Sequence, residues 1–176
     1  MKYKDIKTPF DLYDYMKDNI KYGFVNQNKE KLFRKTTPEI YYMDEIFRNY
    51  YFQSPEELLK SKCGICFDQN KLIKYWLKNN NYIVNTYYTT IRNHTIVVYY
   101  YNNEYYWFER TFDDYKGIHV FDSLDKLFYY YIYVEDSLDS NVEIYEYDNI
   151  PYGVDLYDFI NIAKTKGNLV KKIVKK

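Results

Sequence analysis

The chain has 176 residues, of which 47% are hydrophobic and 22% aromatic, so it is long and apolar enough to bury the core of a single domain. Basic and acidic residues number 25 each, and no basic stripe follows a helix or strand period, which argues against a nucleic-acid partner. No apolar run approaches the roughly 20 residues of a transmembrane helix, so we expect no membrane partner.

The N-terminal end and the cysteines indicate a compartment. The first ten residues, MKYKDIKTPF, contain no apolar stretch that resembles a signal peptide. The two cysteines, Cys63 and Cys66, are too few and too close together to build a disulfide framework. Both observations predict a cytoplasmic protein.

Three helix starts are marked in the first third of the chain by a hydroxyl residue followed by proline. The pairs are Thr8-Pro9, Thr37-Pro38 and Ser54-Pro55. They predict helices over residues 9–19 and 38–50 and a short helix from 55 to about 62, the last with a capping box completed by Glu57. The polar stretch 26–36 is predicted to be a surface loop. The buried positions expected from apolar spacing are Phe10, Tyr13 and Met16 in the first helix, and Ile40, Met43 and Phe47 in the second.

A further helix is predicted from Cys66 to about residue 79, because apolar residues recur there at steps of three and four. The residue pattern then predicts strands at 82–91, 95–101 and 104–110, which are rich in β-branched and aromatic residues. Asn102-Asn103 is predicted to form a tight hairpin turn between the last two strands, because asparagine tolerates positive φ.

The C-terminal third is predicted to alternate helices and a strand. Asp122 or Ser123 caps a short helix, residues 141–147 alternate like a strand, and a last helix runs from Asp155 to about Gly167. The lysines after residue 170 are predicted to form a frayed, solvated tail. Because no repeat or linker interrupts the chain, we expect one domain over 1–176 with an α+β fold, its N-terminal helices packed on an antiparallel sheet.

Cys66 is the candidate nucleophile. A thiol attacks as the thiolate, and the dipole and free N–H groups of a helix N-terminus favour that anion. Cys63 lies before the predicted helix, next to Gly64, and lacks this advantage. Burial of Cys66 as a small apolar residue is the alternative at this point.

The predicted hairpin brings a histidine and a carboxylate together. A two-residue turn pairs residues whose numbers sum to 205, so Ile96 faces Glu109. Because strand side chains alternate, His94 and Glu109 share one face and become diagonal neighbours. A register slip of one residue would separate them.

The expected roles follow from the chemistry. His94 would take the proton from Cys66 and return it to the leaving group, and Glu109 would orient the imidazole and favour its cation. The main-chain N–H of Cys66 and the side chain of Gln53 are candidate oxyanion donors. Asp68 would either orient the catalytic residues without contacting the substrate or complement the helix dipole.

The run Gly64-Ile65-Cys66-Phe67-Asp68-Gln69, followed by an amphipathic helix, resembles the cysteine motif of transglutaminase-like proteins. His94-Thr95 and Trp107-Phe108-Glu109 follow in the family's order, so the resemblance covers about residues 54–117. It implies a papain-like α+β fold and a Cys-His-acid triad, here with Glu109 where the family usually has aspartate. The stretch is similar to small uncharacterised bacterial and phage members of the group.

Three alternatives remain open on the sequence. Cys63 and Cys66 would suit a dithiol redox pair or, with His94 and His119, a zinc site. His119, expected in a loop, would replace His94 as the base. The local run around Cys66 is also similar to that of arylamine N-acetyltransferases, although the chain is short for their extra domains.

The resemblance implies an amide hydrolase or acyl transferase that forms a thioester on Cys66, without a cofactor or metal, on a protein or peptide substrate. Peptide cleavage, deamidation and cross-linking share this chemistry. A catalytically idle binding or inhibitory module of phage–host conflict is the alternative outside enzymology, since intact residues do not prove turnover.

Overall fold

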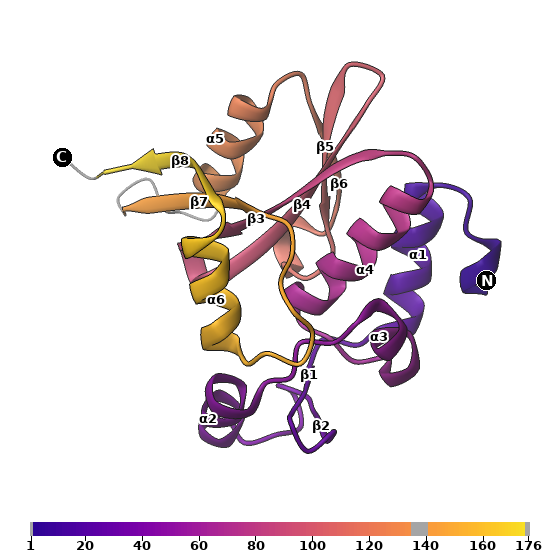
Figure 1. Cartoon of the computed structure of the whole chain (residues 1–176). Helices are drawn as coiled ribbons and strands as arrows, with labels where there is room; N and C mark the ends of the chain where they lie inside the picture. Colours follow the sequence, from indigo (N-terminus) through magenta and orange to yellow (C-terminus); the bar gives the residue numbers. More distant parts are fainter. Residues whose placement is uncertain (1, 135–140, 175–176) are drawn as a thin grey trace.

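The central feature of the fold is a six-stranded antiparallel sheet flanked by helices (Figure 1). The computed structural model describes residues 2–134 and 141–174, and its architecture confirms the predicted α+β class. The helices are α1 (Pro9–Asn19), α2 (Glu39–Asn49), α3 (Pro55–Ser61), α4 (Cys66–Asn79), α5 (Leu124–Val134) and α6 (Leu156–Thr165). The strands are β1 (Phe24–Val25), β2 (Lys31–Leu32), β3 (Ile83–Thr89), β4 (His94–Tyr101), β5 (Glu104–Glu109), β6 (Gly117–Phe121), β7 (Val142–Tyr147) and β8 (Asn168–Ile173).

The strands of the main sheet lie in the order β6-β5-β4-β3-β7-β8, and β1 and β2 form a separate two-stranded sheet. The β4–β5 hairpin has the predicted register, with Tyr101 opposite Glu104 and Val97 opposite Phe108. Asn102 and Asn103 have φ angles of 49° and 65°, as a type I′ turn requires. The predicted two-residue turn is therefore confirmed.

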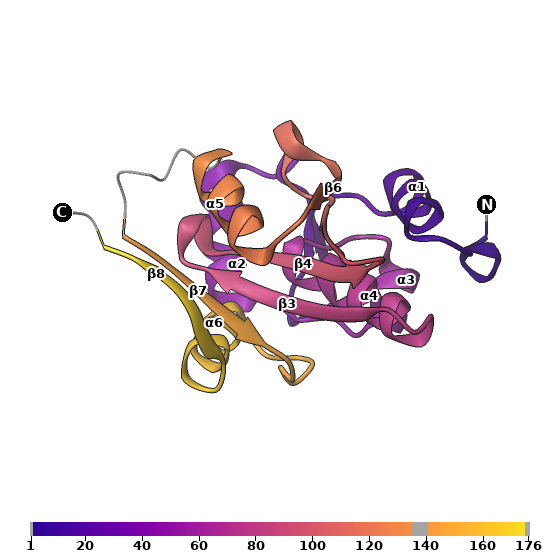
Figure 2. The same ribbon diagram turned by 90° about the horizontal axis from the view of Figure 1, so that it is seen from above.

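The two faces of the sheet carry different helices. One face packs against α1 and α4, through a buried cluster that includes Leu12, Met16, Leu72, Ile73, Val97, Tyr99 and Phe108. The other face packs against α5, through Ile96, Val98, Trp107, Leu127 and Phe128. Alternating residues of β4 thus serve opposite layers. The first and last described residues lie at opposite ends of the molecule in both views (Figure 2).

The predicted buried faces of α1 and α2 are confirmed in part, because Tyr13 and Phe47 are partly buried against the apolar clusters. Met16 is buried, but Phe10 is 61% exposed, and α1 instead buries Leu12 and Tyr15. In α2, Ile40 and Met43 are exposed, whereas Tyr42 and Glu45 are buried. The buried carboxylate of Glu45 is stabilised by the side-chain amides of two asparagines, at 3.1 Å from Asn26 and 2.8 Å from Asn49.

Several short strands were missed by the sequence prediction. The stretch expected to be a surface loop contains β2, whose Leu32 is buried. His119, expected in a loop, lies in β6 opposite Trp107. Lys171 and Lys172, expected in a frayed tail, lie in β8 and pair with β7, while residues 175–176 fall outside the described part of the chain.

None of the helices in the described ranges is both long and apolar enough to cross a membrane.

Candidate active site

Cys66 is the first residue of α4, as predicted, and only 5% of its surface is exposed. The chain reaches this position through Gly64, where a Cβ atom would lie 2.6 Å from Leu58 Cδ1 and 2.9 Å from Asp68 Cβ. Only glycine fits this close approach between α3 and α4. The main-chain N–H of Ile65 donates to Asp68 Oδ2 at 3.1 Å and so closes the first turn of the helix.

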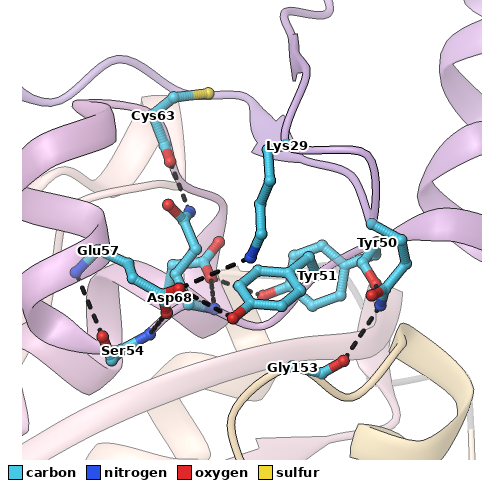
Figure 3. A network of polar contacts seen from close by, with 10 residues as sticks. Lys29, Tyr50, Tyr51, Ser54, Glu57, Cys63, Asp68 and Gly153 are labelled. Carbon is cyan, nitrogen blue, oxygen red and sulfur yellow. Dashed lines mark hydrogen bonds and ion pairs between the residues drawn. The ribbon is translucent and has the colours of Figure 1, made fainter.

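Asp68 connects the start of α4 to the segment that precedes α3 (Figure 3). Its Oδ1 accepts hydrogen bonds from the Tyr50 hydroxyl at 2.9 Å and from the main-chain N–H of Gln53 at 3.0 Å. Burial raises the pKa of Asp68 to about 7, against the opposing effect of these hydrogen bonds. Asp68 is therefore a buried connector of two segments and not merely an exposed first-turn acid.

Side chains from other parts of the chain hold the segment of residues 50–54 in place (Figure 3). The Tyr51 hydroxyl donates to Glu57 at 2.8 Å, and Lys29 lies 3.0 Å above the Tyr51 ring and 3.6 Å from Glu57. The Gln27 side chain donates to the carbonyl oxygens of Tyr50 and Gly153, at 2.8 Å and 3.1 Å. These contacts fix the backbone that carries Gln53 beside Cys66.

Gln53 is buried, and its side-chain amide donates to the carbonyl oxygen of Cys63 at 2.8 Å. This hydrogen bond occupies one of the two amide hydrogens, so the predicted oxyanion role of Gln53 rests on the other. In Figure 3 the carbonyl of Cys63 points toward this amide and its sulfur points away. Burial, followed by the charge of Asp68, raises the pKa of the Cys63 thiol to about 12, so Cys63 stays protonated.

The structure brings His94 and Glu109 into direct contact. His94 opens β4 and Glu109 ends β5, and His94 Nε2 lies 3.1 Å from Glu109 Oε2. The side chains are 12% and 3% exposed, so the hydrogen bond lies in a largely dry environment. The diagonal pairing expected from the hairpin register places the two groups as predicted.

The second carboxylate oxygen of Glu109 is held by the chain that follows β5. Glu109 Oε1 accepts hydrogen bonds from the main-chain N–H of Thr111 at 2.7 Å, the Thr111 hydroxyl at 3.0 Å and the main-chain N–H of Phe112 at 2.9 Å. Burial alone would raise the pKa of Glu109, but the charge of His94 and the hydrogen bonds to both oxygens outweigh it and lower the pKa. Glu109 is thus ionised in the folded chain.

The pKa of the His94 imidazole is raised by both of its neighbours. Burial opposes its protonation, but the charges of Glu109 and Cys66 and hydrogen bonds to both side chains raise its pKa well above the ordinary value. Because Nε2 binds Glu109, Nδ1 is the ring nitrogen left for Cys66. The ring lies parallel to that of Tyr131, with centroids 6.4 Å apart, and 6.5 Å from that of Phe112.

Asn70 ties the cysteine helix to the histidine strand. Its side-chain amide donates to the carbonyl oxygen of Thr95 at 2.5 Å and to the Thr95 hydroxyl at 3.0 Å. Thr95 follows His94, and Asn70 lies about one turn after Cys66 in α4. The prediction from sequence missed Asn70, although a buried amide on an apolar helix face was a signal for such a partner.

The alternatives to this site have different surroundings in the structure. His119 Nε2 donates to the carbonyl oxygen of Tyr115 at 2.7 Å, and its ring packs 5.1 Å from that of Trp107. Within residues 2–134 and 141–174, no group of three or more His, Cys, Asp or Glu side chains is placed to hold a metal ion. A helix, α3, precedes Cys63, where a thioredoxin-like redox motif has a strand.

A comparison with known proteins identifies the family. A family model described as a transglutaminase-like domain matches residues 2–117 of the chain. The matched range contains Cys66, His94 and Glu109. No curated protein matches the chain.

Proposed function

The chain belongs to the transglutaminase-like domain family, and from that premise we propose that it is a cysteine-dependent amide hydrolase or acyl transferase acting through a thioester on Cys66. One observation carries this proposal. The buried His94–Glu109 hydrogen bond, 3.1 Å long, adjoins a cysteine at the N-terminus of a helix. Such a nucleophile suits an amide of a protein or peptide substrate, either in a side chain or in the backbone.

The first half of the reaction begins with a proton transfer from Cys66 to His94. His94 takes the thiol proton, and the raised pKa of its imidazole favours the resulting cation. The thiolate is favoured by the N-terminus of α4. Sulfur attacks the amide carbon, a carbon–sulfur bond forms, and the carbonyl electron pair moves to oxygen as an oxyanion.

The second half releases the amine and then the acyl group. The oxyanion collapses, the carbon–nitrogen bond breaks, and His94 protonates the leaving amine, which leaves a thioester on Cys66. Water as the acceptor gives hydrolysis or deamidation, and a lysine amine gives a cross-link. His94 takes a proton from either acceptor as it attacks the thioester carbon. The new carbon–oxygen or carbon–nitrogen bond forms, the carbon–sulfur bond breaks, and Cys66 leaves as the thiolate.

Glu109 keeps the imidazole in the orientation that this cycle needs. Its carboxylate accepts a hydrogen bond from Nε2–H, so Nδ1 stays directed at the sulfur, and its ionised state favours the imidazolium. The three hydrogen bonds to its other oxygen prevent rotation of the carboxylate. Cys66, His94 and Glu109 therefore have separate roles in the proposed triad.

Thiol labelling with iodoacetamide at pH 6.5 tests the proposal. An ordinary thiol with a pKa of about 8.5 is about 1% thiolate at this pH, so fast alkylation there needs a base that removes the thiol proton. We expect Cys66 to alkylate up to about 100-fold faster in the wild-type chain than in His94→Ala. Mass spectrometry of the peptides separates Cys66 from Cys63.

His119→Ala is the matched control, because it removes the other histidine of the chain. We expect this variant to alkylate Cys66 at the wild-type rate. A wild-type chain in which Cys66 reacts no faster than Cys63, whose thiol is buried and protonated, would contradict the proposed function.

A further inference from the structure

Tyr22 lies on a segment that is bonded directly to the approach to Cys66. The main-chain N–H of Lys21 donates to the carbonyl oxygen of Lys62 at 2.9 Å, and the N–H of Gly64 donates to that of Lys21 at 3.2 Å. Lys21 and Cys63 thus form an isolated parallel bridge. Tyr22 is the next residue, so its position beside the start of α4 is fixed by main-chain hydrogen bonds.

Gly23 permits this close approach on the other side of Tyr22. A Cβ atom at Gly23 would lie 2.5 Å from the carbonyl oxygen of Leu32 and 3.0 Å from Cys63 Sγ. A side chain at this position would push the segment away from Cys63. The backbone on both sides of Tyr22 is therefore packed against the residues that lead into Cys66.

Tyr22 is accessible from solvent and interacts electrostatically with the groups of the proposed site. The residue is 46% exposed, whereas Cys66 is 5% exposed. Burial, then the charges of Cys66, Tyr42 and Glu109, raise the pKa of Tyr22 well above its ordinary value. The hydroxyl therefore stays protonated among the groups of the proposed site and is a permanent hydrogen-bond donor.

Other donors near Cys66 are engaged elsewhere. The Tyr50 hydroxyl donates to Asp68, and hydrogen bonding by Thr95 and Thr86 lowers the pKa of Tyr147 against the effect of burial. The Gln53 amide donates one of its two hydrogens to the Cys63 carbonyl, so it is engaged in part.

Tyr42 also has a buried hydroxyl, which has no hydrogen-bond partner among the described residues. The largest charge effect on its pKa, after burial, comes from Cys63, whereas for Tyr22 it comes from Cys66. Cys66 has the largest charge effect on the pKa of Tyr147 as well, but Tyr147 is only 9% exposed. Tyr22 is 46% exposed, so it is the one of the two that a substrate can reach.

We propose that Tyr22 is a further catalytic residue, whose hydroxyl donates a hydrogen bond to the oxyanion formed on the acyl group at Cys66, opposite the main-chain N–H of Cys66. The inference rests on the proposed function and names the second oxyanion donor of the same site. When sulfur attacks the acyl carbon, the carbonyl electron pair moves to oxygen, and the Tyr22 hydroxyl stabilises that charge without losing its proton. Collapse of the oxyanion then expels the leaving group.

Tyr22→Phe tests this role because it removes the hydroxyl and keeps the ring. Acylation is followed by release of nitrophenolate from p-nitrophenyl acetate, with the Cys66→Ala chain as background. In this step a carbon–sulfur bond forms, the ester carbon–oxygen bond breaks, and nitrophenolate leaves with the electron pair. We expect Tyr22→Phe to acylate about 100-fold more slowly, the typical loss for one oxyanion donor.

Alkylation by iodoacetamide separates this effect from damage to the nucleophile, because displacement of iodide forms no oxyanion. We expect the alkylation rate of Cys66 in Tyr22→Phe to stay within about twofold of wild type. Tyr41→Phe, an exposed tyrosine on α2, is the matched control and is expected to change neither rate.

Acylation by Tyr22→Phe at the wild-type rate would overturn the inference, as would an equal loss of alkylation and acylation. It would also be overturned if Tyr42→Phe lost acylation and Tyr22→Phe did not. Failure of the proposed function is recognised earlier, in the wild-type chain, by a Cys66 that alkylates no faster than Cys63.

Discussion

Asp68 shows how one buried carboxyl joins three parts of the chain. Its two oxygens accept hydrogen bonds from Ile65 at the start of α4, from the main chain of Gln53 and from the hydroxyl of Tyr50. The residue is 1% exposed, and burial raises its pKa to about 7. Since the free carboxyl has a pKa of about 3.9, Asp68 makes the stability of the fold depend on pH.

The sign of this dependence is fixed by proton binding. Between about pH 4 and 7 the folded chain keeps a proton on Asp68 that the unfolded chain has lost. The contribution of Asp68 to the free energy of unfolding therefore falls as the pH rises through this window, by up to about 1.4 kcal/mol per pH unit. Below and above the window its contribution is constant.

Asp68→Asn removes this titration. We expect the difference in free energy of unfolding, wild type minus variant, to fall between pH 4.5 and 7 in urea titrations. The exposed Asp14→Asn on α1 is the matched control for the substitution itself. Parallel pH curves for wild type and Asp68→Asn would show that Asp68 titrates normally.

At the scale of elements, the β4–β5 hairpin is what brings His94 to Glu109. The register depends on a turn in which both asparagines have positive φ, 49° at Asn102 and 65° at Asn103. Asparagine tolerates this conformation and a β-branched residue does not. A change in the turn therefore affects both stability and the candidate site.

Asn103→Val places a β-branched side chain in the left-handed region. We expect a loss of about 1–2 kcal/mol in the free energy of unfolding, measured in urea. Asn168→Val, at the exposed start of β8, is the control and is expected to be neutral or slightly stabilising. An equal effect at the two positions would mean that positive φ does not govern the turn.

The same hairpin explains how much of the site was predictable. Its register follows from local rules, a two-residue turn and side-chain alternation, so the pairing of His94 with Glu109 could be inferred from the sequence. Asn70 and Thr111 were missed, because their hydrogen bonds join segments whose approach no local pattern describes. Tyr22 was also missed, because no local pattern separates it from the other tyrosines of a chain that has 26.

Helix boundaries were predicted better than helix faces. The start of α1 and the capping box of α3 follow from Thr-Pro and Ser-Pro pairs, and the structure has both. The face of α2 was misassigned in part, because apolar spacing counts Ile40 and Met43 as buried and Glu45 as exposed. The amide partners that stabilise the Glu45 carboxylate come from Asn26 and Asn49, and only the folded chain shows that they converge.

At the scale of the whole molecule, the support of the site extends beyond the region that the family model matches. The match ends at residue 117, but β7 pairs with β3 in the centre of the sheet. Helix α6 packs Phe159 against Phe67 and Phe52, with ring centroids 4.4 Å and 4.9 Å apart. Phe67 follows Cys66, and Phe52 precedes Gln53, so α6 packs against both the start of α4 and the segment that carries Gln53.

Because this packing joins the end of the chain to the site, we expect Phe159→Ala to affect both stability and reactivity. Phe159 is fully buried, so truncation removes apolar contacts and leaves a cavity, at a cost of about 3–5 kcal/mol in urea unfolding. The start of α4 loses its packing partner, so alkylation of Cys66 at pH 6.5 should fall as well. Phe10→Ala, 61% exposed on α1, is the control and is expected to stay within about 0.5 kcal/mol of wild type. If Phe159→Ala instead matched this control in both measurements, the matched region would fold and hold its site without α6.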